Sequence, residues 1–332
     1  LVAPHNFTCE FVVGPVAKSL QSAAHQLGPQ STGYAAQHLL PQQLAHHLCR
    51  GLNGLEHHVP YKAIADQHLG LALQGVGRLQ VTHKTKGQAL DERDGPVAGA
   101  LGSSTLRVVM SGVLGGDRRP LAGQWQSHLS NCRDILRDVL SLADDHGVSI
   151  AIENHSDATS DDMLWMCEEL DSNYIGITLD VGNVLAVCEE PMGYTERLMP
   201  HLRNIHLKDY TLHPTDEGYR MARCALGKGV VDFPTLLSMI DAHHPNITKT
   251  IELGAIYARH VRMLADDYWA EYLDRDIKEM LPFLRLYWQH VQPRDQDWRS
   301  PKEKEESQGA LLAYETREFK ESVAYLKEIG AV

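Results

Sequence analysis

The sequence lacks paired cysteines, long apolar runs and an excess of basic residues. Its six cysteines are widely scattered and include no C-x-x-C pair, which in a chain of 332 residues is typical of reduced thiols in a cytoplasmic protein. No apolar run approaches the roughly 20 residues needed to span a bilayer. The first 20 residues contain no Lys or Arg before Lys18, so they make a poor secretory signal. We therefore expect a cytoplasmic protein without a membrane partner.

The charge balance argues against a polyanionic partner. The formal net charge is −12, whereas nucleic-acid-binding proteins normally present an excess of Lys and Arg. Apolar residues make up 43% and charged residues 22% of the chain, the mixture of a globular protein rather than a disordered one. No G-x-G-x-x-G motif follows an expected strand, which weakens a dinucleotide-binding alternative.

Apolar segments and amphipathic helices alternate along most of the chain. Strands are predicted at 54–58, 70–76, 104–111, 148–153, 174–180, 202–207 and 247–253. Helices are predicted at 43–50, 61–68, 124–146, 161–170, 194–199 and 233–242. Most strands are apolar along their length, so both faces are expected to be buried, as in a parallel sheet covered by helices. About eight such units favour an α/β fold of the closed (β/α)8 TIM-barrel type over an open sheet.

The two ends of the chain differ from this alternating part. Residues 1–30 form an N-terminal segment that no pattern assigns, and residues 31–275 are predicted to form the barrel. Charged and aromatic helices are expected at 263–273, 276–289 and 313–329. The first would be the last barrel helix, and residues 276–332 would form a C-terminal helical extension packed on the barrel.

Four acidic or imidazole side chains stand at the carboxyl ends of four successive expected strands: Glu153, Asp180, His206 and Glu252. The first two spacings, 27 and 26 residues, each fit one strand–helix unit. Parallel strands of a barrel all end at the same face, so these side chains should converge. Three carboxylates held together repel one another unless a cation neutralises them. Oxygen and imidazole ligands favour one divalent ion, Mn2+ or Mg2+ ahead of Co2+ or Zn2+.

With IAIENH, TLDVGN, IHLKDY, IELGA and a G-x-G-x-x-D turn at Gly227, Gly229 and Asp232, the sequence resembles the xylose isomerase-like TIM-barrel superfamily of sugar (phosphate) isomerases and epimerases. The resemblance covers about 101–264. It implies that Glu153, Asp180, His206 and Glu252 bind one divalent metal ion. It also implies that Glu153 and Glu252 act as acid and base on opposite faces of a small carbohydrate substrate.

Other residues near these strand ends are candidates for substrate binding. His155 and Lys208 each lie two residues beyond an expected ligand, and Arg223 lies in the inserted loop expected at 211–229. Asn183 stands where many isomerases of the superfamily carry a histidine, three residues after the ligand aspartate. Asn can hydrogen-bond a hydroxyl group but cannot shuttle a proton near neutral pH.

The leading hypothesis is a metal-dependent isomerase or epimerase of a sugar, sugar phosphate or keto-sugar that works through proton abstraction and a metal-stabilised enediolate. A decarboxylase or lyase acting on a 3-oxo sugar acid or 3-oxo sugar is the alternative, because Asn183 departs from the isomerase pattern. An endonuclease IV-like phosphodiesterase would need more metal ligands than the sequence offers. A barrel used only for binding, and a homo-oligomer, also remain open.

Overall fold

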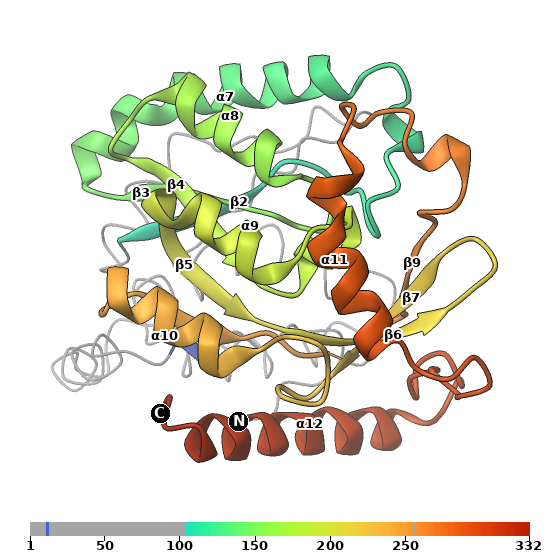
Figure 1. The fold of residues 1–332 in the computed structure, drawn as a ribbon. Helices are drawn as coiled ribbons and strands as arrows, with labels where there is room; N and C mark the ends of the chain where they lie inside the picture. Colours follow the sequence, from blue (N-terminus) through green and yellow to red (C-terminus); the bar gives the residue numbers. More distant parts are fainter. Residues whose placement is uncertain (1–10, 13–103, 255) are drawn as a thin grey trace, which may run out of the picture.

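The centre of the molecule is a curved sheet of parallel strands (Figure 1). The structure is a computed structural model, and it describes residues 11–12 and 104–332 with the exception of residue 255. In this sheet the strands follow the order β1-β8-β5-β4-β3-β2, and only β1 runs antiparallel to its neighbour. Their bounds are β1 (Phe11–Val12), β2 (Thr105–Val109), β3 (Ser149–Glu153), β4 (Ile175–Asp180), β5 (Leu202–Leu207) and β8 (Thr248–Ile251).

Burial on both faces explains why these strands lack polar–apolar alternation. All six residues of β4 are buried, as are four of the five residues of β3. The five strands predicted between 104 and 253 are confirmed to within a few residues. The strands predicted at 54–58 and 70–76, and the helices at 43–50 and 61–68, lie outside the described residues.

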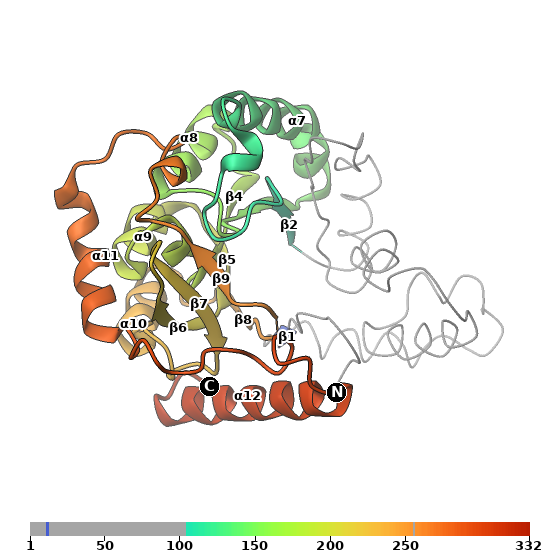
Figure 2. The same ribbon diagram turned by 90° about the vertical axis from the view of Figure 1, so that its right-hand side faces the viewer.

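Four helices follow one another around the outside of the parallel sheet (Figure 2). They are α7 (Trp125–His146), α8 (Ser160–Leu170), α9 (Pro191–Leu198) and α10 (Phe233–His243). Each agrees with a predicted helix. α7 ends at Gly147, whose left-handed backbone closes the last turn. α9 begins three residues earlier than predicted, because Glu190 caps its N-terminus and Pro191 occupies the first turn, where its missing N–H group costs nothing.

A second, three-stranded antiparallel sheet lies at the carboxyl end of the parallel one. It consists of β6 (Asp209–Pro214), β7 (Tyr219–Cys224) and β9 (Arg259–Val261), in that order. The inserted segment 211–229, expected as a loop, is therefore largely a β-hairpin. Its turn is closed by the Thr215 backbone N–H, which donates to the Gly218 carbonyl oxygen at 2.8 Å.

The helix predicted at 263–273 is wrong, because only the short 3-10 turn η5 (Asp266–Tyr268) forms there. Side-chain hydrogen bonds of three aromatic residues replace the helical pattern, and those of Tyr268 and Tyr272 reach distant parts of the chain. The Tyr268 hydroxyl donates to the Ala186 carbonyl, the Trp269 indole to the Met263 carbonyl, and the Tyr272 hydroxyl to the Gly116 carbonyl. These anchors lie on different parts of the chain, so a regular helix could not reach all of them.

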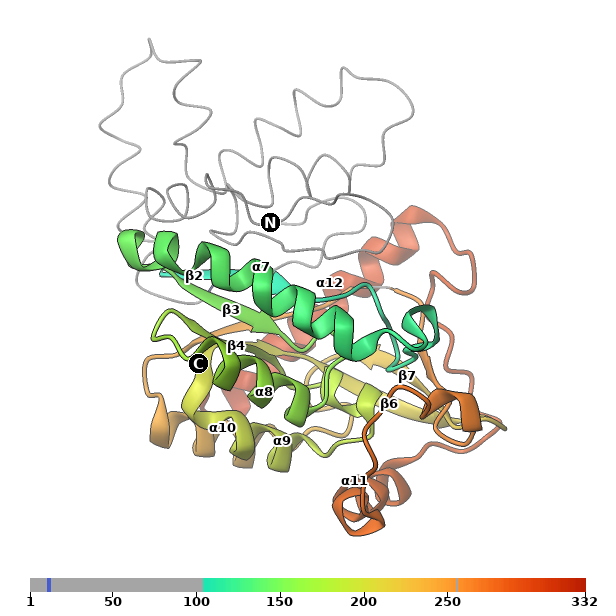
Figure 3. The same ribbon diagram turned by 90° about the horizontal axis from the view of Figure 1, so that it is seen from above.

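The C-terminal region contains the two predicted helices, α11 (Ile277–His290) and α12 (Gln308–Glu328). α11 buries Phe283 and Tyr287 against Tyr219 of β7. α12 begins five residues earlier than predicted, capped by Ser307. The two helices lie on separate sides of the molecule (Figure 3). Within the described residues, no helix is long and apolar enough to cross a bilayer.

Asp209 ties the hairpin to the segment that leads into α10. Its carboxylate, fully buried, accepts backbone N–H groups from 210, 227, 229, 230 and 231 at 2.9 to 3.2 Å. A Cβ on Gly229 would lie 2.2 Å from the Asp209 Oδ1 atom, so this position requires glycine. Asp232, at the end of the same motif, caps α10 by accepting from the Thr235 backbone N–H. The G-x-G-x-x-D motif therefore has a structural explanation here.

We predict that Asp209→Ala lowers the free energy of unfolding by at least about 3 kcal/mol, because it leaves several buried N–H groups without an acceptor. The matched control is Asp216→Ala, since the Asp216 side chain is 92% exposed and pairs only with Arg294 among the described residues. The control should change stability by less than about 0.5 kcal/mol. Urea unfolding measures both, and equal midpoints for the two variants would contradict the prediction.

Candidate metal centre

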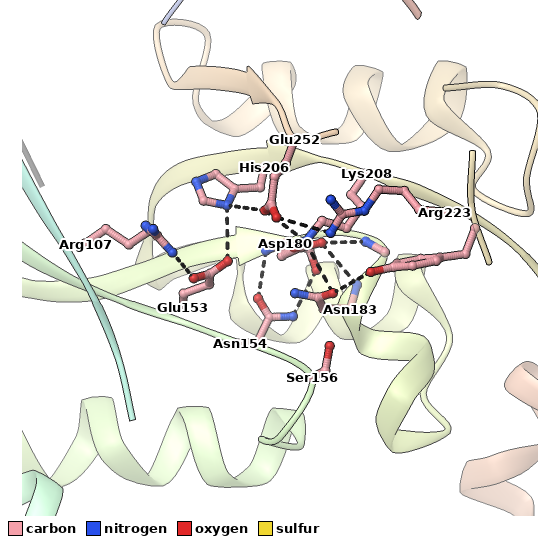
Figure 4. A network of polar contacts seen from close by, with 12 residues as sticks. Arg107, Glu153, Asn154, Ser156, Asp180, Asn183, His206, Lys208, Arg223 and Glu252 are labelled. Atoms are coloured by element: carbon pink, nitrogen blue, oxygen red, sulfur yellow. Dashed lines mark hydrogen bonds and ion pairs between the residues drawn. The ribbon is translucent and has the colours of Figure 1, made fainter. Parts of the chain in front are cut away.

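Four ionisable side chains meet at the carboxyl ends of the parallel strands (Figure 4). Glu153 ends β3, Asp180 ends β4, His206 lies one residue before the end of β5, and Glu252 directly follows β8. The register pairs Asp180 with His206 across neighbouring strands. All four therefore lie at the same end of the sheet, as their positions in the sequence predicted.

The four side chains form a compact and buried cluster. One ligand atom of each lies within 4.8 Å of the others. Three are fully buried, and Glu252 is 6% exposed. The His206 Nδ1 atom lies 3.2 Å from a carboxylate oxygen of Glu153 and 3.2 Å from one of Glu252. The imidazole therefore stands between the two glutamates.

Cationic side chains surround the three carboxylates. The Arg107 guanidinium pairs with Glu153, and the Lys208 ammonium pairs with Asp180. Lys208 also lies 2.8 Å from the Glu252 carboxylate. Arg223 Nη2 approaches the other oxygen of Glu252 at 3.3 Å. Figure 4 shows Arg107 on one side of the cluster and Lys208 and Arg223 on the other.

These partners set the pKa values of the carboxyl groups. Burial by itself would raise the pKa of Glu153, but Arg107 and the contact with His206 hold it well below its usual range. Burial would also raise the pKa of Glu252, but the charge of Lys208 and the contact with His206 hold it well below its usual range. Burial raises the pKa of Asp180 despite Lys208, and the charges of Glu252 and Glu153 add to that rise. Of the three carboxyl groups, Asp180 is therefore the one whose pKa is raised by its neighbours' negative charges.

Asn154 holds Asp180 in place from the neighbouring strand. Its side-chain amide donates to the Asp180 carbonyl oxygen at 2.9 Å, and its amide oxygen accepts the Asp180 backbone N–H at 2.7 Å. The Asp180 Oδ1 atom accepts from the backbone N–H groups of Gly182 and Asn183, both at 3.1 Å. These contacts leave Asp180 Oδ2 directed at Lys208.

A second layer of polar side chains meets at Asn183. Its side-chain oxygen accepts from Arg259 Nη1 at 2.8 Å, from the Tyr210 hydroxyl at 3.1 Å and from Lys208 at 3.4 Å. His155 is partly buried, and burial lowers its pKa to about 3, while the charge of Glu153 opposes that shift. The imidazole of His155 is therefore neutral at pH 7.

The four candidate substrate-binding residues differ in how they lie relative to the metal-ligand cluster. Asn183 and Arg223 adjoin the cluster, and Arg223 lies on β7 rather than in a loop. His155 lies near enough to feel the charges of Glu153, Arg259 and Lys208. Lys208 is fully buried and already engaged with two carboxylates, so its first task is to neutralise them.

Sequence reasoning missed three residues of this site. Arg107 interrupts the apolar strand TLRVV, and a charged residue inside a buried strand was the available signal. Tyr210 and Arg259 gave no such signal, because they reach the site only through the three-stranded sheet.

The donor set fits a single divalent ion in size and chemistry. Ligands on opposite sides of an octahedral ion with bonds of about 2.1 Å lie about 4.2 Å apart, close to the 4.8 Å span of the cluster. Three carboxylates and one imidazole are ligands that hard and borderline cations accept. A buried group of four His or acidic residues could therefore hold a metal ion.

Comparison with known proteins agrees with this architecture. The profile of a family described as "Xylose isomerase-like TIM barrel" matches residues 92–271, more than half of the chain. The chain belongs to the xylose isomerase-like TIM-barrel family. Its (β/α) barrel fold, with helices at the C-terminus, is thereby confirmed, and the five described parallel strands form a curved half of the barrel sheet.

Among curated proteins, the chain is similar to 3-oxo-isoapionate decarboxylase of Pectobacterium atrosepticum, with 28% identity over 120 residues. The match covers 36% of this chain and 44% of that enzyme, so the chain spans less than half the length of this relative.

Two solved structures are similar in fold at low identity. One is a xylose isomerase-like TIM-barrel protein from Mycobacterium smegmatis in complex with magnesium, at 14% identity and a TM-score of 0.42, covering 69% of this chain and 80% of that one. The other is D-allulose 3-epimerase from Methylomonas sp., at 16% identity and a TM-score of 0.40, covering 72% and 67%. Nothing about the chemistry of this chain follows from them.

We predict that Lys208→Met lowers the free energy of unfolding of the metal-free protein by about 3–5 kcal/mol, because it leaves two buried carboxylates without their shared ammonium. Lys304→Met is the control, since Lys304 is 37% exposed and pairs with the partly exposed Asp297; it should cost less than about 1 kcal/mol. Chemical unfolding in the presence of a chelator measures the difference. A Lys208 variant as stable as the control would contradict the assigned role.

Proposed function

We propose that the protein is a divalent-metal-dependent isomerase or epimerase of a small keto-sugar, free or phosphorylated. The observation that carries the proposal is the cluster at the carboxyl end of the barrel, in which three carboxylates and an imidazole bring ligand atoms within 4.8 Å of one another. The description of the family, xylose isomerase-like, supports the same class of chemistry.

Glu153, Asp180, His206 and Glu252 would hold one ion, with Mn2+ or Mg2+ preferred over Co2+ or Zn2+ because oxygen ligands dominate. When bound, the ion supplies Lewis-acid polarisation of a substrate carbonyl, which acidifies the neighbouring C–H bond. Asn154 keeps Asp180 oriented through two hydrogen bonds, and oriented ligands are what a defined coordination geometry requires.

Glu153 and Glu252 are the proposed acid–base pair. They come from β3 and from the end of β8, two strands that β4 and β5 separate in the sheet, so they approach the site from different sides. Their pKa values are held well below the usual range, and both are therefore ionised at neutral pH. An ionised carboxylate beside an acidified carbon can accept its proton, and the other glutamate can return a proton on the opposite face once it has taken one up from solvent.

Four residues are proposed to bind the substrate: His155, Asn183, Lys208 and Arg223. The Asn183 Nδ2 atom is buried and has no hydrogen-bond partner in the described part of the chain, so it is available to a substrate oxygen. The same holds for Nε and Nη1 of Arg223. The ammonium of Lys208, which pairs with the carboxylates of Asp180 and Glu252, would bind a substrate oxygen beside them.

Decarboxylation of a 3-oxo sugar acid, or a related lyase reaction, is the second candidate. Two observations favour it. Asn183 occupies a position from which a histidine could have moved a proton, and the chain is 28% identical to a 3-oxo-isoapionate decarboxylase over 120 residues. Loss of CO2 needs an electron-accepting carbonyl but no base at carbon, which suits glutamates whose pKa values are low.

The cysteines and the net charge bear on the cellular location and the partners of the protein. The four described cysteines are free thiols, as expected for a reducing compartment, and we propose a cytoplasmic location. The net charge of −12 speaks against nucleic acid as substrate and against an endonuclease IV-like activity. The protein could act as a homo-oligomer, which size measurements would decide.

We expect the metal-depleted protein to take up one divalent ion per chain. Asp180→Asn and His206→Gln should weaken Mn2+ binding at least about 100-fold, because the first removes a negative charge and the second an imidazole nitrogen from the ligand set. Asp216→Asn, at an exposed position, should bind like the wild type. Calorimetric titration with elemental analysis measures affinity and stoichiometry. A wild-type protein that stays free of Mn2+, Mg2+, Co2+ and Zn2+ would refute the proposal, and several ions per chain would revive the phosphodiesterase.

In deuterated water, the Mn2+-loaded enzyme should introduce deuterium at the carbon next to the carbonyl of an accepted keto-sugar without releasing CO2. Glu252→Gln should slow this exchange at least about 100-fold, because a neutral amide cannot accept the proton. NMR follows the exchange, and trapping of CO2 runs in parallel. Release of CO2 in step with deuterium incorporation from a 3-oxo sugar acid would replace isomerisation with decarboxylation.

A further inference from the structure

Arg259 is a buried cation that has no carboxylate partner in the described part of the chain. It lies on β9 and is 8% exposed. Its Nη1 atom donates to the Asn183 side-chain oxygen at 2.8 Å and to the Ser156 hydroxyl. Within the described residues no carboxylate pairs with it, and its Nε atom has no hydrogen-bond partner. Burying a charge is costly unless an opposite charge or several hydrogen bonds compensate it, so this guanidinium is set up for an anion.

Arg259 and Arg223 lie on the same face of the three-stranded sheet, the face that borders Asn183 and the metal-ligand cluster. Residues directly opposite each other in neighbouring strands share a face of the sheet, as do residues two apart in one strand. Arg259 pairs with Met221, and Arg223 lies two residues beyond Met221 on β7. Tyr210 pairs with Arg223 across β6 and β7, and its hydroxyl donates to Asn183. Both arginines therefore extend from one face toward Asn183 and the metal cluster.

Buried donors that lack acceptors gather at this point. They are Arg259 Nε, Arg223 Nε and Nη1, and Asn183 Nδ2, each without a hydrogen-bond partner among the residues that the structure describes. An unsatisfied buried donor costs about 1–3 kcal/mol. Several together, all donors and no carboxylate among them, match the oxygen atoms of an anionic group.

The local charge balance leads to the same conclusion. The three carboxylates of the cluster are accompanied by four cationic side chains, Arg107, Lys208, Arg223 and Arg259. Among the residues that the structure describes, these side chains leave one positive charge over even without an ion, and a divalent ion would raise the excess to three. A neutral sugar would leave this excess uncompensated in a buried site, whereas an anionic substrate would reduce it.

We propose that Arg259, together with Arg223, forms an oxyanion subsite beside the metal cluster, so that the substrate carries a carboxylate or a phosphoryl group. The inference rests on the proposed function for the reacting part of the substrate and adds its charged part. Arg259 is a specificity-determining residue here, because a guanidinium binds carboxylate or phosphate oxygens in a fixed, two-pronged geometry. A carboxylate would make the substrate a keto-sugar acid, and a phosphoryl group would make it a keto-sugar phosphate.

The test compares three probes of similar size: D-glycerate, inorganic phosphate and the neutral dihydroxyacetone. Their dissociation constants for the Mn2+-loaded wild type, Arg259→Ala and Arg259→Lys are measured by calorimetry. Wild type should bind at least one of the two anions about tenfold more tightly than dihydroxyacetone. Arg259→Ala should lose about tenfold in affinity for that anion and less than twofold for dihydroxyacetone. Any chelation of glycerate by the metal ion contributes equally to the affinities of the wild type and both Arg259 variants, so it cancels when their affinities are compared.

Arg220→Ala is the matched control. Arg220 lies on β7, one residue before the Met221 that pairs with Arg259, so its side chain is on the other face of the sheet. There it stacks on Trp298 at 4.5 Å, so its removal should leave anion affinity unchanged. Arg259→Lys keeps the charge but not the fork and should bind the anion with intermediate affinity. If Arg259→Ala does not fold, the lysine variant and the wild-type preference decide.

Two results would overturn the subsite: a wild type that binds all three probes equally, or an Arg259→Lys or Arg259→Ala protein that binds the anion as the wild type does. Preference for glycerate or for phosphate identifies the anionic group, and either supports the proposal. The titration is repeated on metal-free protein. Arg259-dependent anion binding in a protein that takes up no metal would uphold the subsite while the proposed function fails.

Discussion

Neutralisation of three buried carboxylates is the constraint on which the site depends. Glu153, Asp180 and Glu252 are buried, and like charges at such distances cannot all be ionised without compensation. Two cationic side chains outside the ligand set neutralise these carboxylates. Arg107 comes from β2 at one edge of the sheet, and Lys208 comes from the single residue between β5 and β6. A cluster balanced in this way is held together before any ion binds, which preorganises its ligands.

Two sheets divide the work. The parallel sheet contributes the metal-ligand candidates, because every one of its strands ends at the same face. The antiparallel sheet contributes Tyr210, Arg223 and Arg259, which reach that face from above the strand ends. Asp209 joins the two, since it is the first residue of β6, follows β5 after the single residue Lys208, and binds the backbone that leads into α10. The hydrogen bonds of Asp209 therefore connect the two sheets at the point where the site lies.

Local patterns predicted the parts of the fold in which periodicity and burial agree. The parallel strands and the helices α7, α8 and α10 lie close to their expected positions, because a buried strand is apolar throughout and a covering helix is amphipathic. The expectation failed at 263–273, where a helical pattern is dissolved by three aromatic anchors. It also missed the hairpin, since β6 and β7 mix histidine, arginine and other polar residues with apolar ones.

Four side chains could be placed together at one end of the barrel from the amino-acid sequence, because the direction and the end of each strand are enough to locate Glu153, Asp180, His206 and Glu252. The amino-acid sequence alone could not determine which cations balance them. Arg107 and Arg259 lie 46 residues before and 53 residues after the candidate ligands Glu153 and His206, and only strand pairing brings them to the site. Charge compensation acts through space, so its partners are chosen by the tertiary structure rather than by spacing along the chain.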